Sequence, residues 1–297
     1  MHAIDYAIPG SVKEAVALLS QGQAEVLAGG TDLLLRLKAD QPTPRLVVDV
    51  KRIPGFDELR FDVRTGLAIG PAVTLAALAG DPVVQRRYPA LAQGAGLVGS
   101  VQIRNRATLA GNLCNAAPSA DTAPPLLVLG ARMRLAGPEG RRTLALEEFF
   151  LGPGENALQP GELVVGIQVP APRGRSGSAY ARHTLREAMD LAVVGVGVAL
   201  RLAPRRPVCE EIAIALGAVA PTPMRATQAE AVLEGEELTP ERIAWAAGLA
   251  AAQSRPISDV RASAEYRREL VEVLTRRMLE AAVEDARRQR PTRRKAA

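Results

Sequence analysis

Hydrophobic and polar positions in the first fifty residues switch between two periods. Residues 11–19 place apolar side chains at helical spacing, and Ser11 with Glu14 has the spacing of a capping box, which is typical of helix starts. Short apolar runs at 24–28 and 46–50 predict strands, and residues 32–38 between them predict a helix. This alternation of helix and strand predicts a small α/β unit.

Shorter elements follow up to residue 170. Residues 55–70 have the alternation of a hairpin, Thr74 can cap a helix that ends by Gly80, and Asp81 opens a further helix through residue 91. Short strands are predicted at 131–136, 144–146 and 162–169.

The amino-acid composition changes between Gly94 and Asp121. This stretch is rich in glycine, alanine, serine and asparagine and has almost no bulky periodicity. It is long for an ordinary connection, and its composition is too polar and flexible for a core. We therefore expect backbone that is arranged around a ligand.

Residues 170–178 form the best candidate linker, because they are rich in proline, glycine and serine. Beyond it we expect strands at 180–184, 191–202 and 211–219, and helices at 226–233, 240–252 and 264–287. The linker predicts a larger N-terminal domain and a smaller C-terminal domain that meet near residue 175.

Charge is concentrated at one end of the chain. The 297 residues carry 37 Lys and Arg against 32 Asp and Glu, but residues 287–297 alone hold six basic side chains and no acid. The rest is nearly neutral, so the basic excess predicts a disordered tail rather than a nucleic-acid-binding protein. An aromatic content of 3% also argues against stacking platforms for single-stranded nucleic acid.

The cysteine content and the length of the apolar runs exclude further classes of protein. The two cysteines, Cys114 and Cys209, cannot form a disulfide framework or hold an iron–sulfur cluster, and they predict a reducing, cytoplasmic location. No secretory signal is expected, and the longest apolar run, residues 191–200, is shorter than the ~18 residues of a membrane span. No spacing of histidines, cysteines and acids predicts a metal site.

Three glycine patterns are candidates for binding chemistry. Residues 94–99 match G-x-G-x-x-G, but the segment before them reads as a helix, whereas the dinucleotide fingerprint needs a strand there. Residues 28–33 (AGGTDL) and 108–113 (TLAGNL) each place small residues before a predicted helix. Two such loops could hold a diphosphate through backbone amides, or they could serve only as turns.

The second and third patterns belong to a longer resemblance. Residues 28–34 (AGGTDLL), 103–113 (IRNRATLAGNL) and 115–121 (NAAPSAD) resemble the FAD-binding segments of the medium, flavoprotein subunit of molybdenum hydroxylases of the carbon monoxide and xanthine dehydrogenase type. Residues 186–194 (REAMDLAVV) and 258–268 (SDVRASAEYRR) resemble the C-terminal domain of that family. The match follows the family's order over nearly the whole chain.

The resemblance implies an α/β (α+β) fold in three parts. A vanillyl-alcohol-oxidase-type (PCMH) FAD-binding domain would cover residues 1–175, with subdomains of about 1–55 and 56–175. A C-terminal α/β domain of the CO dehydrogenase flavoprotein type would cover residues 176–286. Residues 287–297 would form the basic disordered tail.

The resemblance also implies the flavin contacts. The diphosphate would be wrapped by Leu27, Ala28, Gly29, Gly30, Thr31, Asp32 and Leu33 and by Thr108, Ala110, Gly111 and Asn112. Asn115 and Ser119 would make further contacts, and Asp121 would accept hydrogen bonds from the ribityl portion or would merely cap a helix. One residue of 163–165, taken as Val164, would pack near the flavin ring. Arg182 would lie beside the flavin or would be an ordinary solvated charge.

The implied function is electron transfer through non-covalently bound FAD, with no catalytic residue of the chain's own. A molybdenum-pterin large subunit would hydroxylate the substrate, a 2Fe–2S small subunit would relay the electrons, and FAD would pass them to NAD, a quinone or oxygen. The assembly would be a dimer of heterotrimers without nucleic acid or membrane span. A self-sufficient FAD-dependent oxidoreductase of the same fold is the alternative, although the sequence offers no obvious substrate base.

Overall fold

The computed structural model describes residues 4–39, 44–204, 206 and 208–288, and contacts divide the chain into two compact units. The first unit comprises the described residues up to Leu78, Val98–Ala117 and Gly130–Ala171. The second comprises Ala79–Leu97, Pro118–Leu129 and the described residues from Pro172 onward. The second unit therefore includes two segments that precede residue 175. The FAD-binding limits inferred from the resemblance stay a prediction.

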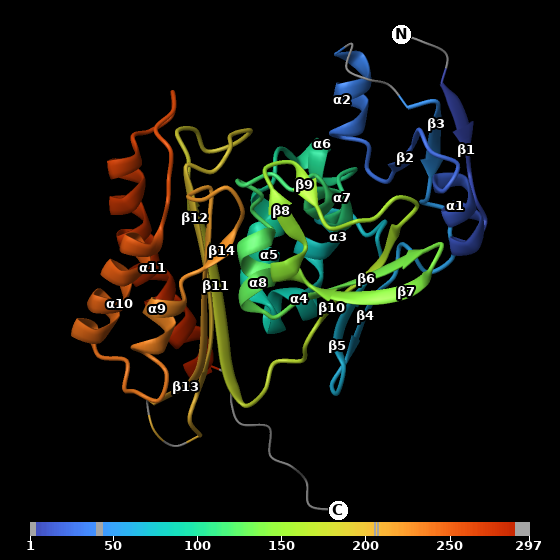
Figure 1. The fold of residues 1–297 in the computed structure, drawn as a ribbon. Helices are drawn as coiled ribbons and strands as arrows, with labels where there is room; N and C mark the ends of the chain where they lie inside the picture. Colours follow the sequence, from blue (N-terminus) through green and yellow to red (C-terminus); the bar gives the residue numbers. More distant parts are fainter. Residues whose placement is uncertain (1–3, 40–43, 205, 207, 289–297) are drawn as a thin grey trace, which may run out of the picture. The chain divides into compact units, whose positions relative to one another are not determined.

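A small parallel sheet opens the first unit (Figure 1). Strands β1 (Asp5–Ala7), β3 (Leu46–Asp49) and β2 (Ala24–Leu27) lie in the order β1-β3-β2. Helix α1 (Val12–Leu19) packs Ala15 and Leu19 with Val48, and α2 (Leu33–Lys38) packs Leu33 and Leu37 with Val47. Because Val47 and Val48 point to opposite faces of β3, the two helices cover opposite faces of this sheet.

An antiparallel sheet forms the rest of the first unit's framework, in the order β4-β5-β10-β6-β7. Its strands are β4 (Leu59–Asp62), β5 (Gly66–Ile69), β6 (Arg132–Gly137), β7 (Gly140–Ala145) and β10 (Leu163–Val169). The smaller elements are α3 (Leu75–Gly80), which begins in this unit, α6 (Val101–Arg104), α7 (Leu109–Cys114), the 3-10 turn Leu146–Glu148, and the hairpin of β8 (Phe150–Gly152) and β9 (Glu155–Asn156).

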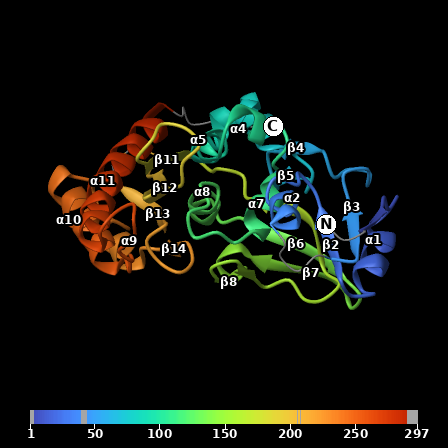
Figure 2. The same ribbon diagram turned by 90° about the horizontal axis from the view of Figure 1, so that it is seen from above.

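The second unit is built on one antiparallel sheet with helices on both faces (Figure 2). Its strands, in spatial order, are β11 (Arg175–His183), β12 (Val194–Leu202), β13 (Cys209–Gly217) and β14 (Met224–Arg225). The long helices α10 (Pro240–Gln253) and α11 (Ala264–Arg288), with α9 (Thr227–Ala231), cover one face; α5 (Pro89–Leu97), preceded by α4 (Pro82–Arg87), and α8 (Ala123–Val128) cover the other.

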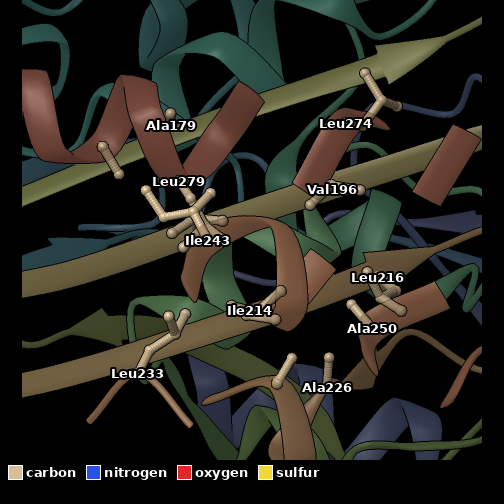
Figure 3. Packing of buried hydrophobic residues seen from close by; sticks show 14 of the residues in the cluster. Ala179, Val196, Ile214, Leu216, Ala226, Leu233, Ile243, Ala250, Leu274 and Leu279 are labelled. Atoms are coloured by element: carbon tan, nitrogen blue, oxygen red, sulfur yellow. The ribbon is translucent and has the colours of Figure 1, made fainter. Parts of the chain in front are cut away.

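Aliphatic side chains fill the layer between this sheet and helices α9 to α11. Figure 3 shows Ile243 of α10 beside Leu279 of α11, and Leu216 of β13 beside Ala250 of α10. Val194, Val196 and Val198 are each 0% exposed. At about 25 cal/mol per Å² of buried apolar surface, this layer is a major source of the second unit's stability.

Several sequence-based expectations need correction. The expectation that the stretch from Gly94 to Asp121 is too polar and flexible for a core was wrong, because α5 runs through Gly94 and α6 and α7 follow within the stretch. Leu109 and Leu113 are fully buried. Because the helices in this stretch are rich in small residues, the sequence shows no periodic pattern of bulky apolar side chains. The same small residues allow the helices to pack closely. The expected linker ends before Arg175, where β11 begins.

The first two residues of the predicted tail are helical instead. Helix α11 includes Arg287 and Arg288, and basic side chains in a last turn favour helix continuation because they complement the helix dipole. The remainder of the predicted tail, 289–297, lies outside the described residues. No helix in the described ranges is long and apolar enough to cross a membrane.

Candidate functional site

The loop that connects β2 to α2 presents a row of backbone donors. It follows Leu27 at the carboxyl end of a parallel strand, an edge where α/β sheets commonly bind ligands. Residues 28–31 are half-buried and Asp32 is exposed. Within the described part of the chain, no acceptor is found for the amide nitrogens of Gly29, Gly30, Thr31 and Asp32. A run of such amides favours an anion.

The two glycines explain how the loop takes this shape. Gly30 has a φ of +77°, in the left-handed region that favours glycine. Gly29 lies so close to a second segment that an added Cβ would stand 2.3 Å from the Arg106 carbonyl oxygen and 2.7 Å from the Ala107 Cα. Both glycines are therefore required by geometry, and the reading of the loop as a simple chain reversal leaves the close approach to Arg106 unexplained.

The second predicted loop is the segment that Gly29 approaches. The Leu75 amide donates to the Ala107 carbonyl at 2.9 Å, so this segment is fixed to the chain that enters α3. Thr108 is buried, and its hydroxyl accepts from the Gly111 amide at 3.1 Å to cap α7. Ala110 is buried, whereas Gly111 and Asn112 are half-buried. The structure thus brings Gly29 next to Arg106 and Ala107, and the cradle that the resemblance implies from residues 28–33 and 108–112 stays a prediction.

The end of α7 is held in an unusual conformation. Ala116 has a φ of +47° although it carries a Cβ, and it is 2% exposed. Its carbonyl accepts from the Gly154 amide at 3.0 Å, and the Asn156 side chain donates to the Cys114 carbonyl at 2.8 Å. The β8–β9 hairpin therefore fixes the turn. Asn115, a predicted flavin contact, lies exposed in this turn.

The register of β10 distinguishes the three residues proposed to face the flavin ring. Leu163 and Val165 pack with the α1 cluster, so the pleat places the buried Val164 on the opposite face of the sheet. The pairing with β6 shifts between Val164 and Gly166. Of the three, Val164 is thus the one that turns away from α1.

Asp121 and Arg182 lie in the second unit, where the structure pairs them. The Arg182 guanidinium donates to Asp121 Oδ2, and the Tyr180 hydroxyl donates to Asp121 Oδ1 at 2.8 Å. The side chains of Arg182 and Asp121 are 4% and 7% exposed. Arg182 is therefore not a solvated strand charge. Ser119 lies half-buried in the turn before α8.

Burial governs the electrostatics of this cluster. Removal from water raises the pKa of Asp121, although the Arg182 charge and the hydrogen bonds from Tyr180 and Arg182 oppose that shift. Burial, with the neighbouring Asp121 carboxylate, raises the pKa of Tyr180 well above its ordinary value, so this hydroxyl keeps its proton and donates. The cluster is consequently satisfied by its own members.

The sequence patterns missed three residues of these sites. Ala107 was quoted in a motif, but its contact with Gly29 depends on tertiary structure. Tyr180 belongs to none of the sequence motifs. The signal that could have found it is Gly195 of β12, where an added Cβ would stand 2.7 Å from the Tyr180 hydroxyl oxygen. Ala116 gave no sequence signal, because alanine rarely adopts a positive φ.

Fold and site together define the class of the protein. The model of the FAD binding domain in molybdopterin dehydrogenase matches residues 2–172, and that of the CO dehydrogenase flavoprotein C-terminal domain matches residues 179–282. The chain belongs to this family of FAD-binding subunits, and its cofactor is FAD. The mixed α/β fold, with an FAD-binding domain followed by a C-terminal flavoprotein domain, agrees with the sequence-based prediction.

Particular relatives support the assignment over nearly the whole chain. The carbon monoxide dehydrogenase medium chain of Hydrogenophaga pseudoflava is 36% identical over 280 residues, which cover 94% of this chain and 96% of the relative. The putative xanthine dehydrogenase FAD-binding subunit of Escherichia coli K12 is 34% identical and covers 92% of this chain and 94% of its own length. A solved carbon monoxide dehydrogenase structure from H. pseudoflava matches with a TM-score of 0.90, 36% identity, and coverage of 96% of this chain and 98% of the other.

The residues of the first unit fit the polar part of FAD. A diphosphate requires several hydrogen-bond donors, and the amides of residues 29–32 supply them. The Asp32 carboxylate is exposed at the edge of the loop. The described residues contain no cluster of histidine, cysteine and acidic side chains that could hold a metal.

Proposed function

We propose that this chain is the electron-transfer flavoprotein subunit of a molybdenum hydroxylase. When bound, FAD would accept electrons that arrive from iron–sulfur clusters and release them to NAD, a quinone or oxygen. The observation that carries the proposal is the row of free amides at residues 29–32, next to the capped segment 106–111, in a chain whose relatives are medium subunits.

The chain's own contribution is to hold and orient the flavin. The loop after β2 would bind the diphosphate through the amides of Gly29, Gly30, Thr31 and Asp32. The buried segment 107–110 would keep that loop in place, because the Gly29 backbone rests on it. Val164 would offer an apolar surface to the ring. The remaining proposed contacts are Leu27, Ala28, Leu33, Thr108, Ala110, Gly111, Asn112, Asn115, Ser119, Asp121 and Arg182.

The proposed electron-transfer role requires partner subunits that carry the other cofactors. A molybdenum-pterin subunit and a 2Fe–2S subunit would supply the centres for which this chain offers no described ligand cluster, and the complex would be a dimer of heterotrimers. Relatives named as a medium chain and as a dehydrogenase complex subunit support the presence of partners. We place the complex in the cytoplasm, which suits two cysteines that are both free.

The test is purification of the native complex with flavin and metal analysis. We expect about one FAD per chain that is released by acid, with molybdenum and iron recovered only with the partner subunits. The isolated chain should retain FAD yet should not oxidise purines, aldehydes or carbon monoxide. Substrate turnover by the isolated chain, or a colourless chain that cannot be reconstituted with FAD, would overturn the proposal.

A further inference from the structure

Three exposed arginines share one face of the β6–β7 hairpin. The register pairs Arg134 with Thr143 and Ala136 with Arg141, so Arg134, Thr143 and Arg141 lie on the same face of the sheet. Arg132 precedes Arg134 by two residues and is on that face too. All three arginines are exposed.

Their charges have no counter-ion in the described part of the chain. Arg134 and Arg141 are diagonal neighbours across the two strands, about 7 to 8 Å apart at the backbone, and like charges so placed repel. Glu139 in the hairpin turn is exposed and forms no salt bridge with them among the described residues. The cost of this repulsion is removed when an anion binds between the two guanidinium groups.

Arg142 of the same hairpin provides the contrast. It lies on the opposite face, where its Nε and one terminal nitrogen each donate to Glu162 at 2.7 Å, and it also donates to the Ala157 carbonyl. The chain therefore neutralises the arginine that packs within the unit. It leaves Arg134 and Arg141 with free donors.

The free arginines line a hollow in the surface. A cavity of about 270 Å³ is bordered by Arg134, Leu135, Arg141, Arg142, Thr143 and Val165. Leu135 is buried and lies on the opposite face with Arg142. The hollow thus combines the guanidinium groups of Arg134 and Arg141 and the Thr143 hydroxyl with an apolar wall from Val165. None of its residues belongs to the proposed flavin contacts.

We propose that this cavity binds the phosphate group of a small molecule. Planar guanidinium groups match the oxygens of a phosphate, and Thr143 can add a hydroxyl donor. The small volume suits a phosphate or diphosphate head with part of its substituent, and it is too small for a dinucleotide. A concave site with an apolar wall favours such a ligand over the flat acidic surface of a protein partner.

The test is calorimetric titration of the full, FAD-loaded chain with pyrophosphate, adenosine diphosphate and adenosine at about 0.15 M salt. We expect one saturable site for pyrophosphate and for adenosine diphosphate, and none for adenosine. Equal affinities for pyrophosphate and adenosine diphosphate would show that the phosphate groups alone determine binding. Tighter binding of adenosine diphosphate would show that its nucleoside also contacts the cavity. Both results support the proposal.

Matched variants locate the site. Arg134→Gln and Arg141→Gln should each weaken pyrophosphate binding about tenfold, because each removes charge-assisted hydrogen bonds. Arg64→Gln removes the same charge from the exposed β4–β5 turn, outside the cavity, and should change nothing. Flavin absorbance per chain should be equal in all variants, which separates this site from the flavin site. Absence of saturable pyrophosphate binding, or equal weakening by Arg64→Gln, would overturn the proposal.

Discussion

The loop at residues 28–32 and the cluster around Asp121 were both predicted as flavin contacts, yet their physical states differ. In the first unit, the loop is half-buried and its amides have no acceptor among the described residues. In the second unit, Asp121 is buried, and both of its oxygens accept hydrogen bonds from Tyr180 and Arg182.

The difference indicates that the loop serves ligand binding and that the Asp121 cluster serves the stability of the fold. Half-exposed amides without an acceptor in the chain can bond to water or to the acceptors of a ligand, so the loop can bind a ligand without breaking a hydrogen bond of the fold. A buried ion pair with its own hydrogen bonds is satisfied without a ligand, and its loss leaves an uncompensated charge. We therefore expect changes in the loop to act on FAD affinity and changes in the cluster to act first on stability.

The largest effect is expected from Arg182→Ala. Loss of the guanidinium leaves the Asp121 carboxylate buried without its charge partner, which should lower the free energy of unfolding by about 3 to 5 kcal/mol. Denaturant unfolding followed by circular dichroism measures this change. Arg186→Ala is the control, because Arg186 is 71% exposed and its ion pair with Asp190 should contribute less than about 1 kcal/mol. Equal losses in both variants would contradict the buried-pair account.

Gly111→Val should weaken flavin binding by distorting the proposed second segment of the site. A Cβ at this position would stand 3.1 Å from the Thr108 hydroxyl oxygen, and the branches of valine would crowd the cap and the half-exposed helix start. FAD affinity should fall about a hundredfold, close to 3 kcal/mol. Gly248→Val is the control, since a Cβ at Gly248 of α10 meets nothing within 4 Å. Wild-type FAD affinity in a folded Gly111→Val chain would remove this segment from the site.

Tyr180→Phe tests how much the second hydrogen bond to Asp121 contributes to stability. The change removes one hydrogen bond to Asp121 but keeps the Arg182 pair, so the stability loss should be about 2 kcal/mol, smaller than that of Arg182→Ala. Tyr266→Phe, at an exposed tyrosine outside the cluster, should cost less than about 0.5 kcal/mol. Urea midpoints of the three variants give the ranking, and a Tyr180→Phe loss no larger than that of Tyr266→Phe would refute it.

The smallest effect concerns Glu162, the first unit's counterpart of Asp121. Hydrogen bonds from Arg142 lower the pKa of Glu162 below its ordinary 4.5, whereas burial raises that of Asp121. Stability from Glu162 is therefore present above its ordinary pKa and is lost as pH falls through the lowered pKa. Glu162→Gln should cost about 1 kcal/mol at pH 7, and the difference from wild type should shrink as the pH falls to 3. A difference that is independent of pH would show that the carboxylate charge does not matter.

The sequence predicted most of the elements because their signals are local. Thr74 was predicted as a helix cap, and its hydroxyl does cap α3 by accepting from the Ala77 amide. The helices of the C-terminal region follow the apolar periodicity of their sequence. The alanine- and glycine-rich stretch before Asp121 was misjudged, because close packing of small residues gives no periodic pattern. The pairing of Asp121 with Arg182 spans 61 positions, and spacing alone could not predict it.

The candidate site was predictable in part for the same reason. Gly29 and Gly30 stand out as a turn, and the family resemblance made them a diphosphate loop. Their free amides could not be predicted, because the acceptor of each amide depends on the tertiary fold. The positive φ of Ala116 is likewise set by the β8–β9 hairpin and not by its own sequence.

The central claim is that backbone amides after β2 hold the FAD diphosphate, and Asp32 allows a direct test. Asp32 stands immediately before α2 with a φ of −97°, roughly 30° from the value that proline favours, and Asp32→Pro deletes one amide donor. Asp32→Ala removes the same carboxylate but keeps the amide. Flavin fluorescence titration should show wild-type or tighter FAD binding for Asp32→Ala and about tenfold weaker binding for Asp32→Pro, with unchanged circular dichroism in both. Equal dissociation constants for the two variants would contradict the claim.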